Sequence, residues 1–315
     1  MADTQEKFSS VQVLTIDPET SGQRIDNYLL GLLRGIPRSH VYRIIRKGEV
    51  RINKGRIRAD YRLQAGDRIR IPPLRLPARG AVQRPGGEVL ARLSKAILFE
   101  DERLLVIDKP SGIAVHGGSG LRYGVIEALR ALRPEAPYLE LVHRLDRDTS
   151  GCLLIAKRRS ALRTLHELLR HGAVDKRYLA LLAGEWKGRA REVKAALRKN
   201  TLRSGERIVR VDVEGKPART RFKPVQTLWA ATLVEARLYT GRTHQIRVHA
   251  AHIGMPVVGD LKYGDDTVNS LWRKRGVDRL FLHAHSVEFR WPGEARSFKI
   301  QAPLEPRLEA AVDSS

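Results

Sequence analysis

A polar segment of nine residues, HRLDRDTSG at positions 143–151, contains the side chains best suited to chemistry. It comes directly before the apolar run Cys152–Ile155, which reads as a buried strand. A loop at the end of a core strand holds its side chains rigidly. The segment carries two carboxylates, Asp146 and Asp148, between arginines. In a compact cationic pocket a carboxylate stays ionised, so it can act as a nucleophile or as a base.

A metal site is the first alternative, because aspartates and histidines are common metal ligands. His249 and His252 stand three residues apart in a segment, Thr243–Ile253, that is expected to be helical. The chain has no His-Glu-x-x-His arrangement, however, and its single cysteine cannot complete a cysteine-rich site. We therefore expect no metal, and an activity that survives a chelator would confirm this.

Two other kinds of site are suggested by short patterns. The run GGSG at 117–120 resembles a phosphate-binding loop but lacks the Gly-Lys-Ser/Thr ending. Ser150 with His143 and Asp148 has the residue types of a hydrolase triad, but the glycines of a nucleophile elbow are missing around the serine. Both patterns are weak evidence.

The elements that must position these residues form an α+β catalytic domain over 96–315. Short apolar strands alternate there with a few helices, which is typical of a largely antiparallel or mixed sheet flanked by helices. Strands are expected at 97–99, 104–107, 153–156, 178–183, 207–213, 218–225 and 231–238, and helices at 123–132, 161–169 and 243–253. With 315 residues, the chain has room for a second domain.

That second domain is expected at the N-terminus. Residues 24–79 hold fifteen basic residues against four acidic ones, a large share of the chain's net charge of +23. Two helices and short strands are expected there, and a proline- and glycine-rich stretch follows them. We predict a flexible N-terminus over 1–22, an RNA-binding module over 23–80 and a linker over 81–95.

The excess of positive charge indicates a polyanionic partner, and nucleic acid fits best. The residues expected to contact RNA lie on the second helix and the turn after it; they are Arg38, Ser39, Arg43, Arg46, Lys47, Arg51, Lys54 and Arg56. No apolar run is long enough to span a membrane, and residues 1–7 lack the pattern of a signal peptide. These features predict a cytoplasmic protein without membrane partners.

Four motifs in order resemble those of the RluA-type pseudouridine synthases. The segment 143–151 is similar to the central Arg-Leu-Asp-x-x-Thr-Ser-Gly motif of that family. KPSG at 109–112, KRYLA at 176–180 and GRTHQIRVH at 241–249 are similar to three more. Residues 23–67 resemble an S4 RNA-binding module. The resemblance covers nearly all of the chain from residue 23 onward.

The resemblance implies that a uridine in RNA is isomerised to pseudouridine without a cofactor. Asp146 corresponds to the essential aspartate, which either attacks C1′ of the ribose or removes its 2′ proton. Arg247 corresponds to the basic residue that pairs with it, Tyr178 to the tyrosine that stacks on the base, and Arg144 to the arginine that replaces the flipped nucleotide. Asp148 occupies a variable position of the motif.

The expected substrate is 23S ribosomal RNA of the large subunit. A monomeric enzyme is expected to modify several of its uridines. The family members that act on this RNA resemble the chain most, in the S4-like module and in stretches such as 119–127. Two alternatives stay open: the same chemistry on tRNA or another ribosomal site, and an RNA-binding assembly factor without activity. The integrity of the motif around Asp146 argues against an inactive protein.

Overall fold

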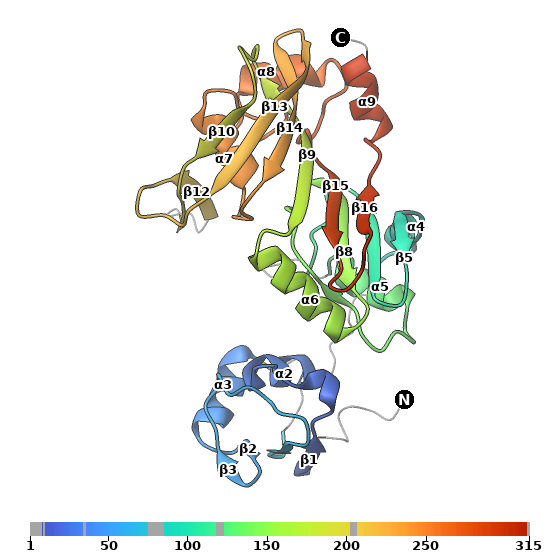
Figure 1. Ribbon diagram of the computed structural model, residues 1–315, viewed down its shortest axis with the longest axis vertical. Coiled ribbons are helices and arrows are strands. Elements are labelled where there is room, and N and C mark those ends of the chain that lie inside the picture. Colours follow the sequence, from blue (N-terminus) through green and yellow to red (C-terminus); the bar gives the residue numbers. More distant parts are fainter. Residues whose placement is uncertain are drawn as a thin grey trace. The chain divides into compact units, whose positions relative to one another are not determined.

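The computed structural model describes residues 8, 10–33, 36–74, 85–117, 123–201 and 207–313. The chain divides into two compact units, Met1–Gln83 and Arg84–Ser315, each with its own core (Figure 1). The division falls inside the expected 81–95 linker. Residues 118–120, which are most of the glycine run considered as a phosphate loop, lie outside the described residues.

The first unit packs two helices on a small antiparallel sheet. The strands β1 (Gln12–Thr15), β4 (Arg68–Ile71), β2 (Arg51–Ile52) and β3 (Gly55–Arg56) are neighbours in that order. In α3 (Arg38–Arg46), residues Val41, Ile44 and Ile45 recur at helical spacing and are buried. They pack in one core with apolar residues of α2 (Ile25–Leu32), such as Leu29.

Residues 1–22, predicted to be flexible, contain ordered structure from β1 onward. Ile16 is buried in the core of the first unit, and β1 pairs with β4 from Gln12↔Ile71 to Thr15↔Arg68. A strand of four residues is too short for its alternation to stand out in the sequence. The prediction of a flexible segment is therefore wrong for Gln12–Thr15.

The second unit is built on a mixed sheet of ten strands, in agreement with the α+β prediction. The order of the main path is β10-β13-β14-β9-β15-β8-β6-β5; β16 pairs with β15, and β7 with β8. All of these pairs are antiparallel except β15 with β8. Their bounds are β5 Ile97–Glu100, β6 Leu104–Lys109, β7 Glu140–Leu141, β8 Ser150–Ala156, β9 Val174–Ala183, β10 Arg191–Lys194, β13 Arg219–Leu228, β14 Ala231–Leu238, β15 Leu282–Arg290 and β16 Ser297–Gln301.

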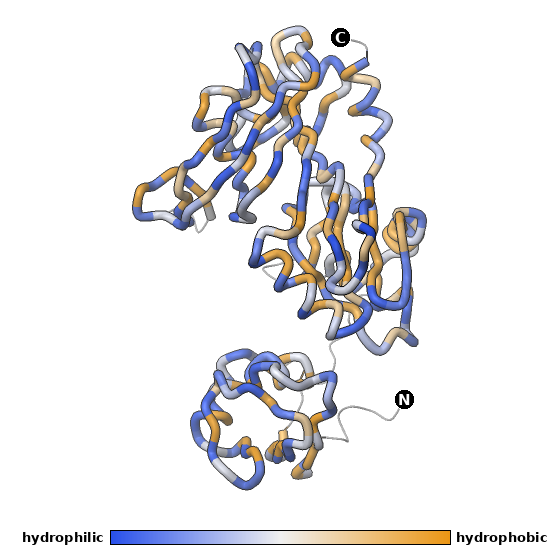
Figure 2. The backbone as a smooth tube through the Cα atoms, viewed as in Figure 1, coloured by the Kyte–Doolittle hydropathy of each residue, from blue (hydrophilic) through white to orange (hydrophobic). Residues whose placement is uncertain are grey.

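The helices of this unit cover both faces of the sheet. Leu105 and Leu153 pack in one cluster with Leu129 of α5 (Val125–Leu132). Their neighbours in sequence, Leu104 and Leu154, pack with α6 (Arg159–Arg170) in another cluster. Strand residues alternate between faces, so helices on both sides bury these strands completely. The colouring in Figure 2 shows hydrophobic stretches along these elements, separated by hydrophilic turns.

Three further helices complete the unit together with a hairpin. The helices are α7 (Gln245–His252), α8 (Asp266–Arg273) and α9 (Pro306–Asp313), and the hairpin joins β11 (Leu197–Thr201) to β12 (Arg207–Val211). Of these, the sequence predicted α7 and β12. Within the described residues, no helix is long and apolar enough to cross a membrane.

The second half of the expected linker is a helix, α4 (Gly87–Lys95), which belongs to the second unit. Its Leu93 is fully buried in the cluster that also holds Leu129. The glycines and prolines before it concealed a short amphipathic segment, Val89–Leu93, whose apolar residues stand three and four apart. The second unit therefore begins before residue 96.

Candidate active site

Asp146 lies in the loop that precedes β8, and hydrogen bonds to a second loop hold this loop in place. The backbone N–H of Gly112 donates to the carbonyl of Arg147 at 3.0 Å. The hydroxyl of Ser111 donates to the carbonyl of Asp148 at 2.8 Å. Both donors come from the KPSG segment that follows β6, so two motifs far apart in sequence form one rigid rim.

A buried lysine fastens the same two loops. The ammonium group of Lys109 donates to the carbonyls of Pro110, Ile113 and Arg147 at 2.8, 2.8 and 2.9 Å. Burial lowers the pKa of Lys109 to about 7, and the three carbonyl oxygens replace the water that the group has lost. Lys109 thus has a structural role, since it holds the loop that contains Asp146 against the loop after β6.

Gly151 allows the strand after this loop to approach β15 closely. Its φ is +105°, and a Cβ at this position would lie 2.3 Å from the carbonyl oxygen of Ala284. Only glycine fits both the backbone conformation and the space. The glycine that ends the central motif is therefore required by the packing of β8 against β15.

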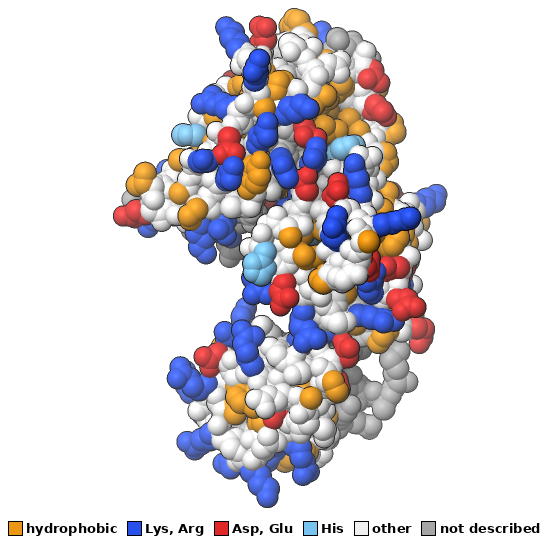
Figure 3. All heavy atoms as spheres, in the orientation of Figure 1, with side chains coloured by type: hydrophobic (Ala, Val, Ile, Leu, Met, Phe, Trp, Pro, Cys, Tyr) orange, Lys and Arg blue, Asp and Glu red, His pale blue; other side chains and the backbone are white. Residues whose placement is uncertain are grey.

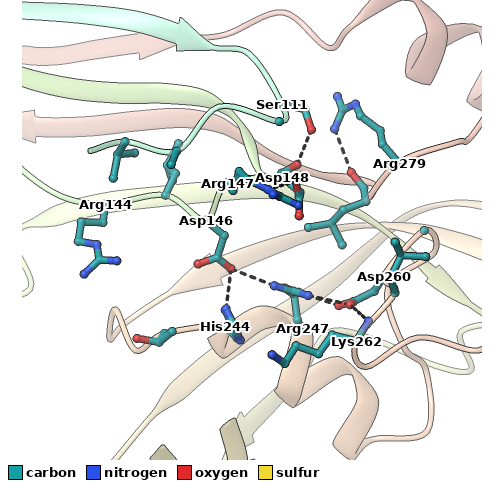
Figure 4. A pocket seen from close by; sticks show the side chains of 18 of the residues that line it. Ser111, Arg144, Asp146, Arg147, Asp148, His244, Arg247, Asp260, Lys262 and Arg279 are labelled. Atoms are coloured by element: carbon teal, nitrogen blue, oxygen red, sulfur yellow. Dashed lines mark hydrogen bonds and ion pairs between the residues drawn. The ribbon is translucent and has the colours of Figure 1, made fainter. Parts of the chain in front are cut away.

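Arg247 connects Asp146 to a second, buried aspartate (Figure 4). Its Nη1 lies 3.3 Å from Oδ2 of Asp146. Its Nε and Nη2 donate to the two oxygens of Asp260 at 2.7 and 2.8 Å, which is a bidentate pair. Asp260 also accepts the backbone N–H groups of Lys262 and Tyr263. The guanidinium is therefore fixed on one side while its free edge faces Asp146.

The charges of this pair are firmly maintained. Burial opposes the charge of Arg247, but Asp260 and then Asp146 raise its pKa above the ordinary value. Burial alone would raise the pKa of Asp260, and the hydrogen bonds from Arg247 hold it below its usual range instead. Asp146, whose side chain is 27% exposed, thus faces a permanent positive charge at the wall of a cavity.

His244 stands beside the same carboxylate in an unusual backbone conformation. It is the residue before α7 and has a φ of 55°. Its Nε2 lies 3.9 Å from Oδ2 of Asp146, and its Nδ1 bonds to the hydroxyl of Tyr263 at 2.7 Å. Burial lowers the pKa of His244, which favours the neutral ring. The neutral ring thus lies between the hydroxyl of Tyr263 and the carboxylate of Asp146.

Tyr178 lies in the same cavity as Asp146. This cavity has a volume of about 320 Å³ and is lined by Arg144, Asp146, Lys176, Tyr178, His244 and Arg247, among others. Tyr178 extends from β9 and is only 7% exposed. Burial and the nearby Asp146 raise the pKa of Tyr178, so it stays a neutral phenol. The structure thus brings together Asp146, Arg247 and Tyr178 at one cavity.

Arg144 is exposed at the rim and lines both this cavity and a larger one of about 880 Å³. Figure 4 shows its side chain on the far side of Asp146 from Asp260. The larger cavity also has basic side chains along its wall, among them Arg92, Lys262 and Arg279. Asp146 therefore lines both a small cavity and a larger one whose wall carries basic and acidic side chains.

The residues of the suggested hydrolase triad have other partners. The hydroxyl of Ser150 bonds to His283 at 2.9 Å and accepts from Arg279, whereas His143 accepts the backbone N–H of Leu154. Asp148 pairs with Arg147 at the surface. Across the part of the chain that the structure describes, no group of three or more histidine, cysteine or acidic side chains could hold a metal ion.

The residues predicted to bind RNA lie on one part of the first unit. Arg38, Ser39, Arg43, Arg46 and Lys47 are exposed on α3 or directly after it, and Arg51, Lys54 and Arg56 are exposed on the β2–β3 hairpin. Asn53 and Lys54 have φ values of 48° and 70°, as the predicted turn requires. The blue spheres in Figure 3 show how many basic side chains this unit exposes.

Sequence reasoning missed Asp260, which holds the arginine of the site. It lies thirteen residues after Arg247 in the segment GMPVVGDLKYG, where its only distinguishing feature is that it directly follows Gly259. Gly259 next to it has a φ of +78°, and a Cβ there would lie 2.0 Å from the carbonyl oxygen of Arg279. Such a glycine-aspartate pair was the available signal.

Comparison with known proteins agrees with this geometry. The family model described as RNA pseudouridylate synthase matches residues 103–252, and the S4 domain model matches residues 23–69. Two solved human structures are similar to this chain. RNA Pseudouridylate Synthase Domain Containing 1 has a TM-score of 0.58 at 26% identity, over 73% of this chain and 90% of that one. RNA Pseudouridylate Synthase Domain Containing 4 has a TM-score of 0.59 at 25% identity, over 72% of this chain and 95% of that one. The chain belongs to the RNA pseudouridylate synthase family.

Curated relatives are similar over nearly the full length. Ribosomal large subunit pseudouridine synthase C of Pasteurella multocida is 56% identical over 95% of this chain and 92% of its own. The protein of the same name from Escherichia coli K12 is 53% identical over 96% of each. The aligned regions include the S4 domain, because they cover 95% and 96% of this chain.

Replacing the buried aspartate tests whether it positions the site. In Asp260→Asn the guanidinium of Arg247 loses its fixed orientation, and a displacement of about 1 Å costs on the order of 10²-fold in rate. Single-turnover pseudouridine formation should fall by that order while RNA affinity changes little. The exposed Asp266→Asn on α8 is the matched control. An Asp260→Asn rate equal to that of the control would contradict the role of Asp260.

The buried His283 predicts a pH dependence of stability. It is 1% exposed, bonds to Ser150 and to the carbonyl of Ala302, and burial lowers its pKa to about 4. The unfolded chain binds this proton near pH 6.5, so the stabilisation is complete above that pH and is lost as the pH falls toward 4. The loss should amount to about 3 kcal/mol in urea unfolding. His283→Gln should reduce this slope; an unchanged slope would show that other groups cause it.

Proposed function

We propose that this pseudouridine synthase acts on uridines of 23S ribosomal RNA in the large ribosomal subunit. The chemistry rests on one observation: Asp146, Arg247 and Tyr178 meet at one cavity, and Asp260 fixes the arginine. The target is supported by the names of relatives that are 53–56% identical over nearly the whole chain, the S4 domain included.

The reaction begins with a uridine turned out of its RNA structure, because Asp146 cannot reach a ribose inside a stack. The base then lies against the ring of Tyr178, and Arg144 at the rim can stack on the neighbouring bases. Asp146 either attacks C1′ or removes the 2′ proton, and the glycosidic bond breaks. The uracil turns, C5 bonds to C1′, and a base removes the proton from C5.

Arg247 and the neutral Tyr178 suit this sequence of steps. The guanidinium is anchored by Asp260 and offers its remaining edge to Asp146, so the carboxylate keeps one orientation through the reaction. The phenol of Tyr178 provides an aromatic face without adding charge to the cavity. None of these steps transfers electrons to or from a carrier, so we propose that no cofactor takes part.

The basic surfaces supply affinity. Arginines on the wall of the larger cavity neutralise phosphates near the target nucleotide, and the exposed residues of α3 and the β2–β3 hairpin bind a second part of the RNA. Two linked contacts raise the effective concentration of substrate at Asp146. We also propose that the enzyme works as a monomer in the cytoplasm.

Asp146→Asn tests the reaction and its catalytic residue together. It should abolish pseudouridine formation and keep most RNA binding, because one charge among many basic contacts contributes little to affinity. Asp148→Asn, two residues away in the same loop, is the matched control and should retain activity. Pseudouridine in ribosomal RNA is mapped by carbodiimide and primer extension in cells that lack the protein and carry each variant.

Stops in 23S rRNA that return with wild type and Asp148→Asn, but not with Asp146→Asn, would support the proposal. Activity in Asp146→Asn would overturn the assignment of the catalytic group. Stops that change only in tRNA or in another ribosomal RNA would keep the chemistry and replace the target. A rate that a chelator leaves unchanged on prefolded RNA would support the absence of a metal.

The first unit can be tested through its salt dependence. Replacing Arg38, Arg43 and Arg46 together with alanine should lower the slope of log K against log salt by about one for each lost phosphate contact. The saturating rate should stay near that of wild type. Arg58, Arg62 and Arg68, replaced together, remove the same charge elsewhere in the unit. Equal effects of the two triple variants would show that α3 has no special part in binding.

A further inference from the structure

Lys176 occupies a position in the small cavity that the steps above do not use. It lies on β9 two residues before Tyr178, so both side chains leave the same face of the strand, about 7 Å apart at their Cα atoms. Both line the cavity that holds Asp146. A Cβ added to Gly241 at the rim of this cavity would lie 3.7 Å from Nζ of Lys176.

The ammonium group of Lys176 lacks a carboxylate partner. Within the described residues it makes no ion pair, whereas the next residue, Arg177, pairs with both Asp175 and Glu235. Burial lowers the pKa of Lys176 below its ordinary value. A desolvated cation beside a cavity is stabilised most by a ligand that places an electron-rich atom next to it.

We propose that Lys176 contacts the target base itself, donating a hydrogen bond to a carbonyl oxygen of the uracil and stabilising the negative charge that develops there. This inference rests on the proposed function. A pyrimidine stacked on the ring of Tyr178 presents its edge to the neighbouring position on the strand, where Lys176 stands. Cation and aromatic ring thus hold the base by its edge and by its face.

The charge to be stabilised follows from the bonds that change. When the bond between N1 and C1′ breaks, its electron pair stays on the uracil and spreads onto the carbonyl oxygens. The electron-deficient C1′ bonds to Asp146, or the sugar loses its 2′ proton to Asp146. When C5 bonds to C1′, either the bond between C1′ and Asp146 breaks or Asp146 returns its proton to C2′, so the charge leaves the base. The C5 proton then departs to a base. Lys176 neither gains nor loses a proton in these steps.

The position of Lys176 favours the base over a phosphate as its partner. The arginines suited to phosphates stand on the wall of the larger cavity, such as Arg92, or are exposed like Arg144. Lys176 is half-buried on the central sheet and shares its cavity with the aromatic face of Tyr178. A phosphate contact is therefore the alternative that the experiment must separate.

Lys176→Met removes the charge and keeps the length of the side chain. Lys223→Met, at an exposed position on β13, removes the same charge away from the site. Single-turnover pseudouridine formation on a fragment of 23S rRNA gives the saturating rate, and binding at several salt concentrations gives the slope. We expect Lys176→Met to lose about 10²-fold in the saturating rate. Its salt slope should equal that of wild type, and Lys223→Met should retain the wild-type rate.

RNA that contains 5-fluorouridine separates charge stabilisation from a structural role. Fluorine withdraws electrons, so the departing base is a more stable anion and needs Lys176 less. The loss caused by Lys176→Met in the rate of base release should therefore be much smaller with 5-fluorouridine than with uridine. A structural defect would reduce both rates equally.

Three results would overturn the inference: an unchanged saturating rate, equal losses on both substrates, or a normal rate with a salt slope lowered by about one, as a phosphate contact gives. If Lys176→Met unfolds at a lower temperature than wild type, Lys176→Gln is measured by the same criteria. Wild type without activity on 23S rRNA fragments would refute the proposed target instead. The two failures are thus distinguishable.

Discussion

The buried pair between Arg247 and Asp260 is the interaction on which the site depends. A guanidinium on the helix after β14 would be costly inside the protein without a partner, and Asp260 provides one with two hydrogen bonds at 2.7 and 2.8 Å. Because Asp260 occupies Nε and Nη2, Nη1 is left to face Asp146 at 3.3 Å. The carboxylate of Asp146 therefore receives its partner from an arrangement that is complete before any RNA binds.

The sheet brings these groups together from distant parts of the chain. Asp146 precedes β8, Tyr178 lies on β9, and β15 runs between these two strands. The close approach of Gly151 to Ala284 and the buried ammonium of Lys109 fix the loop before β8. These contacts hold the loop in one position, which suits the role that we propose for Asp146.

Much of this could be predicted from the sequence, because the chemistry lies in compact motifs. Asp146, Arg247 and Tyr178 stand in segments with a recognisable order of residues, and the amphipathic spacing of Val41, Ile44 and Ile45 predicted the helix that carries the basic surface. Asp260 was missed, since a glycine-aspartate pair alone does not show that the carboxylate will meet Arg247 in the folded chain. The short strand β1 and the helix α4 were also missed, because a few residues between glycines and prolines carry too little periodicity.

The division of the chain at residues 83 and 84 has a consequence for how such enzymes diversify. Every side chain around Asp146 comes from the second unit, and the exposed arginines of α3 come from the first. Mutations that alter the basic face of the first unit leave the packing around Asp146 intact. With the roles that we propose for the two units, selection could redirect the protein among RNA molecules through one unit while the other keeps its chemistry.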